Sequence, residues 1–147
     1  MIANLHDQDF HAWTQQQAAL IRAGKIAELD LEHLMEEIES MGASERSQLQ
    51  SRLKILLGHL LKWQYQPTFR TRSWTATIKE QRLSVLELLD DNPSLKSILE
   101  ERIRKAHPQG VLLAVKETDI DERHFPSLCP YSPDQILDLG FYPEHDS

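Results

Sequence analysis

Apolar residues recur at three- and four-residue spacing along most of this chain, a pattern typical of amphipathic helices. Capping residues and helix breakers predict a first helix from Asp7 to Gly24 and a second from Asp30 to Gly42. The second helix has an apolar side and an acidic side. The apolar side holds Leu31, Leu34, Met35, Ile38 and Met41, and the acidic side holds Glu32, Glu36 and Glu39.

A third helix, from Ser44 to about Gln64, is predicted to be apolar around much of its circumference. Its main stripe consists of Leu49, Leu53, Leu56, Leu60 and Trp63. Such a helix belongs at the centre of a bundle. Gly58 lowers its helix propensity, and a close approach of a neighbouring helix would compensate for that cost.

Helical spacing continues with a fourth helix from residue 72 or 73 and a fifth over 92–107. Pro108 has no N–H to donate, so we expect the fifth helix to end there and a shorter one to cover 109–118. The proline-containing tail 119–147 has a possible short helix at 132–137 and enough apolar residues to pack on the body.

These elements predict an all-α fold, a helical bundle of about five main helices with a central third helix and an irregular C-terminal wrap. The length of 147 residues fits a single helical domain over 1–147. Cys129 is the only cysteine, so no internal disulfide forms. The N-terminus has no signal-peptide pattern and no apolar run reaches membrane-spanning length, so we expect a cytoplasmic protein with no membrane partner.

Charge is unevenly distributed along the chain. The segment Arg46–Lys79 has seven basic residues and no acidic one, whereas the whole chain has a net charge of −7. Together with its aromatic residues, this segment has the ingredients of a nucleic-acid surface. The acidic remainder argues against that partner, and packing of the basic helices beside the acidic ones is the favoured interpretation.

Seven segments of the chain form a recognisable set. They are Asp9–Trp13, Glu36–Gly42, Leu57–Trp63, Ser73–Trp74, Gln81–Arg82, Pro93–Leu95 and Cys129–Tyr131. Together they resemble the bacterial family of domain of unknown function 29, and the resemblance covers nearly the whole chain. It implies a compact, mainly helical protein and no known activity, cofactor or catalytic residue. Similar chains run an uninterrupted helix where this one has Pro108.

Five polar side chains lie on or beside core-facing stripes, where a polar group needs a partner. One interpretation is an interhelical pocket in which Glu37 and His59 act as acid and base and Arg82 holds an anion. The other, which we favour, is a structural network that also includes Arg52 and Gln81.

A metal site is a more specific alternative. His33 lies three residues from Glu36 and four from Glu37, so these side chains could share one face of a helix as metal ligands. This set lacks the further ligands of a helical metal centre, so we expect no metal ion and no cofactor. The other histidines, which we expect to be solvated, are His6, His11, His107, His124 and His145.

No nucleophile motif or nucleotide loop is present, so a non-enzymatic protein-interaction domain is the favoured function. Its partner would be another protein or a second copy of the chain. An enzyme or small-ligand binder that uses the Glu37, His59 and Arg82 pocket is the alternative, and nucleic-acid binding is the third. The predicted interaction surface consists of Trp63, Tyr65, Phe69, Arg70, Arg72 and Trp74.

Overall fold

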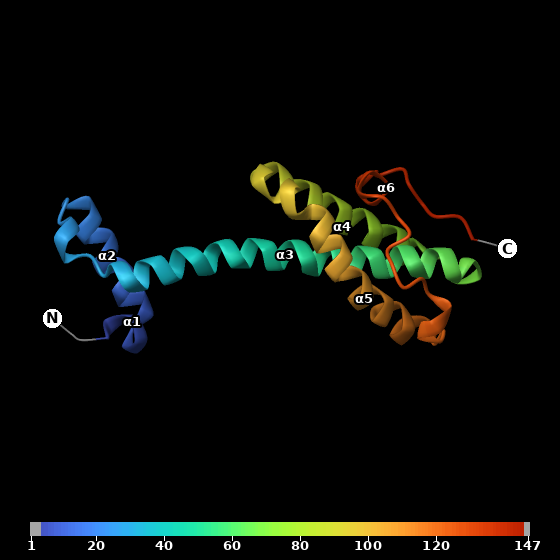
Figure 1. Ribbon diagram of the computed structural model, residues 1–147, viewed down its shortest axis with the longest axis horizontal. Coiled ribbons are helices and arrows are strands. Elements are labelled where there is room, and N and C mark those ends of the chain that lie inside the picture. Colours follow the sequence, from blue (N-terminus) through green and yellow to red (C-terminus); the bar gives the residue numbers. More distant parts are fainter. Residues whose placement is uncertain (1–3, 146–147) are drawn as a thin grey trace. The chain divides into compact units, whose positions relative to one another are not determined.

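The computed structural model describes residues 4–145, and the chain forms two compact units (Figure 1). The first unit ends at Ser44 and the second begins at Glu45. All regular elements in the described residues are helices, which confirms the all-α prediction. None of these helices combines the length and the apolar composition needed to cross a bilayer.

The first unit contains α1 (Leu5–Gln8), α2 (Phe10–Arg22), the 3₁₀ helix η1 (Ile26–Glu28) and the start of α3. Asp9, not Asp7 as predicted, caps α2, because its side chain accepts a hydrogen bond from the backbone N–H of Ala12. Gly24 follows α2 with a φ of 72°, as expected for a glycine that ends a helix.

The helix α3 (Leu31–Tyr65) is one continuous element of 35 residues, so the prediction of two helices separated at Gly42 was wrong. A glycine inside a helix costs about 1 kcal/mol relative to alanine, which weakens a helix without ending it. No proline stands nearby, and Gly42 does not adopt the positive φ that terminates helices. Consequently, Ser44 is an interior residue of α3 and not a cap.

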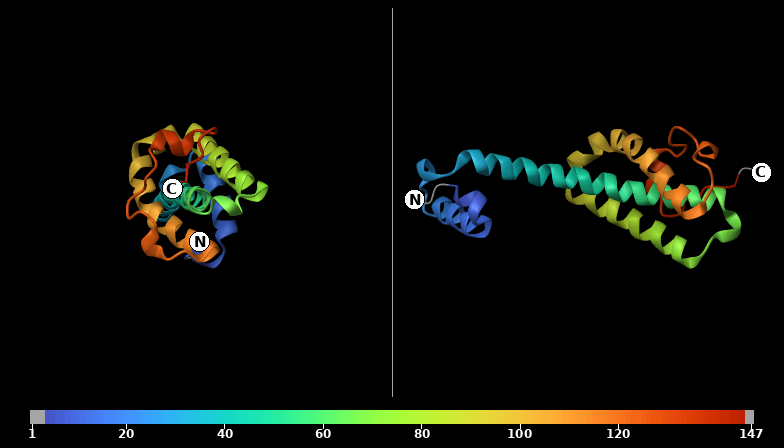
Figure 2. Two further views of the ribbon diagram at one scale, coloured as in Figure 1. Left: turned by 90° about the vertical axis from the view of Figure 1, so that its right-hand side faces the viewer. Right: turned by 90° about the horizontal axis from the view of Figure 1, so that it is seen from below.

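The second unit is built around the C-terminal half of α3, which lies between α4 (Arg72–Asp91), α5 (Leu99–Thr118) and the tail (Figures 1 and 2). Trp63 of the predicted main stripe is only half-buried. The leucines of the stripe are confirmed, since six leucines of this half are fully buried. These are Leu49, Leu53, Leu56, Leu57, Leu60 and Leu61. Removal of this apolar surface from water is the main stabilisation of the unit.

Gly58 lies where the backbones of α3 and α5 approach each other closely. A Cβ atom built on Gly58 would meet the carbonyl oxygen of Gly110 at 3.1 Å and Cδ2 of Leu113 at 2.6 Å. A Cβ atom on Gly110 would in turn meet the backbone nitrogen of Gly58 at 3.0 Å. The close approach of a neighbouring helix, which was predicted to compensate for the low helix propensity of Gly58, is therefore a contact with a second glycine.

The predicted fifth helix differs from the structure at both ends. Residues Pro93–Ile98 form a 3₁₀ helix, η3, and α5 begins only at Leu99. Pro108 lies inside α5, so the predicted break between two helices was wrong. Buried residues on both sides of the proline, from Leu99 to Ala106 and from Gly110 to Ala114, hold the two halves on the same core. The second and third predicted helices are also a single helix in the structure. The described residues therefore contain four α-helices longer than seven residues, and not the five main helices that were predicted.

The tail contains η4 (Glu122–His124) and the predicted short helix, α6 (Pro133–Leu137). Ser132 and Gln135 form a capping box at the start of α6. Phe125, Tyr131 and Ile136 are buried in the same core as the leucines of α3. The tail therefore contributes to the core of the second unit.

Candidate functional site

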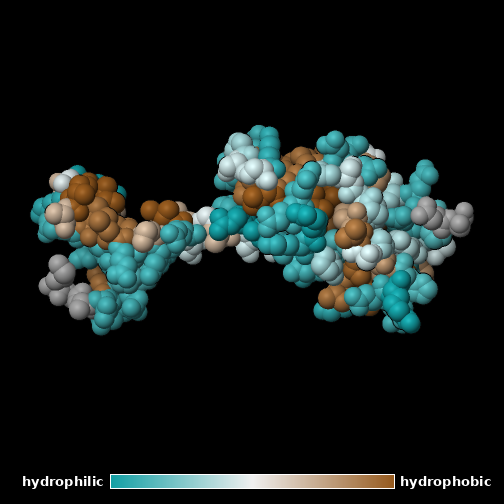
Figure 3. All heavy atoms as spheres, viewed as in Figure 1, coloured by the Kyte–Doolittle hydropathy of each residue, from teal (hydrophilic) through white to brown (hydrophobic). Residues whose placement is uncertain are grey.

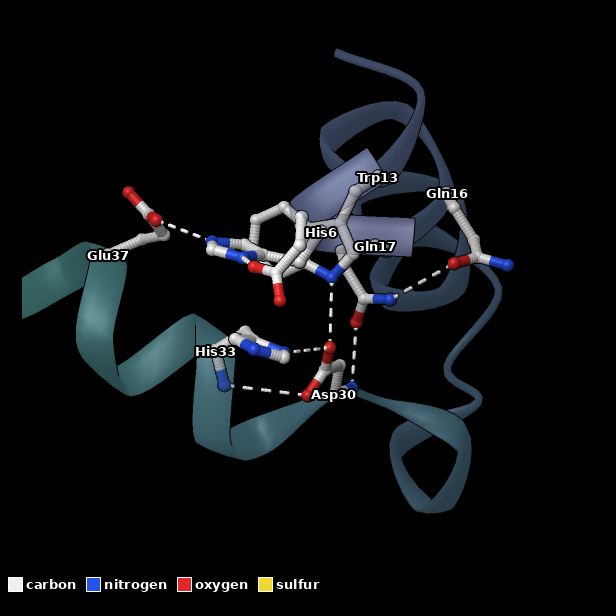
Figure 4. Close-up of polar contacts among 8 residues, drawn as sticks. His6, Trp13, Gln16, Gln17, Asp30, His33 and Glu37 are labelled. Atoms are coloured by element: carbon white, nitrogen blue, oxygen red, sulfur yellow. Dashed lines mark hydrogen bonds and ion pairs between the residues drawn. The ribbon is translucent and has the colours of Figure 1, made fainter. Parts of the chain in front are cut away.

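The first unit brings two histidines together with three carboxylates, although its elements are short. His6 comes from α1, and His33 from the first turn of α3 (Figure 4). Their rings are stacked, with centroids 4.1 Å apart and planes 10° from parallel. We call His6 and His33 the histidine pair.

Asp30 connects α2 to the start of α3. Its Oδ2 accepts a hydrogen bond from Trp13 Nε1 at 3.0 Å and from Nδ1 of His33 at 2.7 Å. Its Oδ1 accepts from the backbone N–H of His33 at 3.4 Å, as expected for the predicted cap of this helix. The backbone N–H of Asp30 donates to the buried Gln17 at 2.8 Å. Two of these four hydrogen bonds hold His33, and the other two join Asp30 to Trp13 and Gln17.

Carboxylates contact both nitrogens of the His6 ring. Nδ1 lies 2.8 Å from Oδ1 of Asp7, and Nε2 lies 2.6 Å from Oε1 of Glu37. A doubly protonated imidazolium donates to both oxygens, whereas the neutral ring has only one N–H. The surroundings of His6 are therefore suited to a cation.

The electrostatics agree with this geometry. Hydrogen bonds to Asp7 and then to Glu37 raise the pKa of His6. The hydrogen bond to Asp30 raises the pKa of His33, and the same bond lowers the pKa of Asp30. Each histidine is stabilised in its charged form by a carboxylate at hydrogen-bond distance.

An exposed apolar surface runs along the same part of α3. We define the apolar stripe as Leu31, Met35, Ile38 and Met41, whose exposed fractions are 65 %, 57 %, 64 % and 65 %. Their spacing of four, three and three residues places them on one side of the helix. The exposed Glu32, Glu36 and Glu39 lie beside this stripe.

Further apolar side chains of this unit are exposed as well, and Figure 3 shows apolar residues gathered on the visible face of α2 and the start of α3. They include Phe10, Ile21 and Ile26. Through Ser44 the sequence has eight acidic and two basic residues, so the first unit carries −6 of the total charge of −7. The first unit is therefore both acidic and unusually apolar at its surface.

The structure gives the three residues of the predicted pocket separate partners. Glu37 belongs to the first unit and contacts His6. His59 belongs to the second unit, where Nδ1 contacts the carbonyl oxygen of Ile55 at 2.9 Å and burial lowers the pKa of the ring. Arg82 also belongs to the second unit and contacts the tail. The described residues thus give Glu37, His59 and Arg82 no shared partner.

Arg82 is fully buried beneath the tail. Its Nε donates to the carbonyl oxygen of Ile136 at 2.8 Å and its Nη2 donates to that of Gln135 at 3.3 Å. Burial lowers the pKa of the guanidinium, and the charges of Tyr142 and Asp138 oppose that shift. Because Gln135 and Ile136 lie in the last turn of α6, Arg82 satisfies carbonyl groups that a helix end leaves free.

The other two members of the predicted network differ in their environment. Gln81 is buried, with 6 % of its surface exposed. Arg52 is exposed, although helical spacing predicted it on or beside a core-facing stripe. A residue at the edge of a stripe is buried or exposed depending on a small rotation of the helix about its axis. Helical spacing alone does not determine that rotation.

The predicted aromatic and basic interaction surface is largely engaged within the second unit. Arg70 lies over the ring of Trp63 at 4.7 Å and donates from Nε to its carbonyl oxygen. Lys62 lies over the ring of Trp74 at 4.4 Å and pairs with Glu117 at 3.1 Å. Tyr65 packs against Phe125. Only Phe69 and Arg72 of the predicted surface are exposed.

Three histidines that were expected to be solvated have defined contacts. His6 joins the histidine pair, and Nδ1 of the exposed His145 lies 2.8 Å from the carbonyl oxygen of Gln64. His107 is 2 % exposed with Nε2 at 2.8 Å from the carbonyl oxygen of Pro126. His107 also lines a cavity of about 420 Å³ between α5 and the tail, together with Cys129. Burial raises the pKa of the Cys129 thiol, which does not favour a nucleophile.

Of the predicted metal ligands, the structure brings His33 and Glu37 close to His6, and it leaves Glu36 exposed beside the apolar stripe. The sequence contains no local signal for His6, because it lies in a helix of only four residues that helical spacing does not predict. Its place beside His33 depends on how α1 folds back on α3.

Comparison with known proteins finds a family that matches the chain. No curated protein and no solved structure matches the chain. Residues 5–142 match a family described as Domain of unknown function DUF29. The match includes both units and all the helices of the described residues, so the chain belongs to the DUF29 family.

Proposed function

We propose that this protein is a protein-interaction domain whose docking surface is the apolar stripe of the first unit. Four large apolar side chains on one side of a helix, each more than half exposed, support this proposal. Exposed apolar surface of this kind is a common feature of binding sites. Two of the four are methionines, whose flexible side chains adapt to a partner.

The charge of the first unit indicates the partner. Three glutamates beside the stripe and a net charge of −6 complement a segment with basic side chains. An apolar stripe on a helix is matched by the apolar side of a second helix. We therefore commit to a cationic amphipathic helix of another protein as the occupant.

A second copy of the chain fits this surface less well. Pairing two stripes would bring two units of charge −6 together, and like charges at an interface oppose association. Self-association through the stripe is therefore disfavoured by the same charges that attract a basic helix.

The test is a titration of the full chain with a labelled synthetic peptide, followed by fluorescence anisotropy. The peptide has leucines at helix positions i, i+3, i+4 and i+7 and lysines elsewhere. We expect saturable binding that weakens with added salt. Ile38→Glu should weaken it about tenfold or more, because a buried apolar side chain contributes roughly 1.5–3 kcal/mol.

Two controls separate docking from general attraction to lysine. Leu112→Glu adds the same charge at a half-exposed leucine of the second unit and should bind as the wild type does. A peptide of identical composition but scrambled order should bind weakly. Equal binding of both peptides, or equal affinities of the two variants, would contradict the proposal.

A further inference from the structure

Two imidazoles and several carboxylates in one cluster are the ligand types that divalent transition metals prefer. One ligand atom from each of His6, Asp7 and His33 lies within 4.8 Å of the other two. Glu37 adds a second carboxylate, since its Oε1 is 2.6 Å from Nε2 of His6. All four side chains belong to the first unit.

We propose that His6, His33 and the carboxylate of Asp7 form a binding site for a zinc-like divalent cation. This inference is independent of the docking function. The imidazoles supply two nitrogen ligands, the carboxylate supplies one oxygen, and water completes four-coordination.

The residues that hydrogen-bond to the proposed ligands are also suited to such a site. A histidine that binds a metal through one nitrogen commonly donates the other N–H to a carboxylate, which fixes its orientation. Asp30 holds Nδ1 of His33 in this way, so Nε2 of His33 is the nitrogen that faces the ion. The bond from Trp13 to Asp30 restrains that carboxylate in turn.

Binding requires only local movement. Ligand atoms around a four-coordinate zinc ion are about 3.3 Å apart for bonds of about 2.0–2.1 Å. Because the three atoms lie within 4.8 Å of one another, the most widely separated two close by at most about 1.5 Å. His6 gives up one of its two carboxylate contacts and releases a proton when the ion takes that nitrogen.

The charge balance favours a divalent ion over two protonated histidines. Two imidazolium rings stacked at 4.1 Å repel each other, and each needs its own carboxylate. One divalent ion neutralises two carboxylates and leaves both rings neutral. The close stacking of the histidine pair is thus an arrangement that a shared cation would stabilise.

The experiment is isothermal titration of the chelator-treated full chain with zinc chloride, with His6→Gln, His33→Gln and Asp7→Asn as variants. We expect one ion per wild-type chain and an affinity lower by about tenfold or more in each histidine variant. His11→Gln removes an exposed histidine of the same unit and should bind as the wild type does. Excess magnesium should not displace zinc, because magnesium prefers oxygen ligands.

Histidine-ring NMR of the wild type provides a readout that does not depend on the folding of a variant. On addition of zinc, the ring signals of His6 and His33 should shift while those of His11 stay in place. Absence of stoichiometric binding, or equal losses in His11→Gln and His33→Gln, would overturn the proposal. Ring shifts at His11 alone would do the same.

Discussion

At the scale of single residues, the contact between Gly58 and Gly110 shows how one missing side chain sets the distance between helices. The two glycines let the backbones of α3 and α5 approach until a Cβ atom added to either residue would fall 3.0–3.1 Å from a backbone atom of the other. Close packing leaves little room to relax, because the surrounding leucines of α3 are fully buried. Space, and not backbone conformation, therefore requires glycine here.

We expect Gly110→Ala to lower the free energy of unfolding by about 1–3 kcal/mol, the usual cost of an overpacked core. Its Cβ atom would lie 3.0 Å from the nitrogen of Gly58 and 3.1 Å from the carbonyl oxygen of Lys54. Denaturant unfolding followed by circular dichroism measures the change. In the control Gly140→Ala the new atom meets only Oδ1 of Asp138 at 3.5 Å, an ordinary contact. Equal stability of the two variants would show that the helices can separate without cost.

At the scale of elements, α5 shows tertiary contacts overriding a local signal. Proline in a helix interior removes one hydrogen bond and crowds the preceding turn, at a cost of about 3 kcal/mol. The helix nevertheless continues through Pro108, because Ile103, Ala106, Val111 and Ala114 lie in one core. The free energy gained by burying these residues exceeds the free-energy cost of the proline.

Pro108→Ala should therefore stabilise the second unit, by up to about 3 kcal/mol, since it restores a backbone donor and relieves the crowding. Pro108 is exposed, so the substitution leaves no cavity in the core. Thermal unfolding monitored at a helical circular-dichroism band tests this expectation. Gln109→Ala, at the exposed neighbouring position, is the matched control and should change the midpoint little. A lower midpoint for Pro108→Ala would mean that the proline ring itself stabilises α5.

At the scale of the whole molecule, apolar burial and net charge are distributed differently between the two units. The residues of the hydrophobic core cluster and those packed against it all lie between Leu49 and Tyr142. The first unit buries Trp13 and Gln17 among its described residues and carries most of the negative charge. The second unit thus contains the hydrophobic core, whereas the first unit has exposed apolar residues and most of the negative charge.

A fragment of residues 45–147 should fold by itself and unfold cooperatively, because it contains the entire core cluster. A fragment that ends at Ser44 should have little helix, since so short a chain buries too little apolar surface to offset its conformational entropy. Circular dichroism with thermal melts of both fragments makes the comparison. A non-cooperative melt of the larger fragment would show that its core depends on the residues before Glu45.

Several features of the fold follow from local spacing alone. The buried side of α3 from Leu49 to Leu61 and the capped helix α6 were predicted correctly. In each case the positions of apolar and capping residues within one or two helical turns decide the structure. The candidate site was predicted less well, since only His33 and Glu37 among its members had a local signal.

The amino-acid sequence by itself determined the all-α fold and the central buried segment, and it placed the residues of the apolar stripe on one side of α3. The exposure of that stripe follows only from the tertiary structure. Tertiary structure decided that His6 stacks on His33, that Gly110 meets Gly58, and that Arg82 holds the end of α6. The members of each pair lie many helical turns apart in the sequence, so no helical period relates them. Their proximity depends on the packing free energy of the folded chain, which is a sum over all contacts and cannot be read from any one segment.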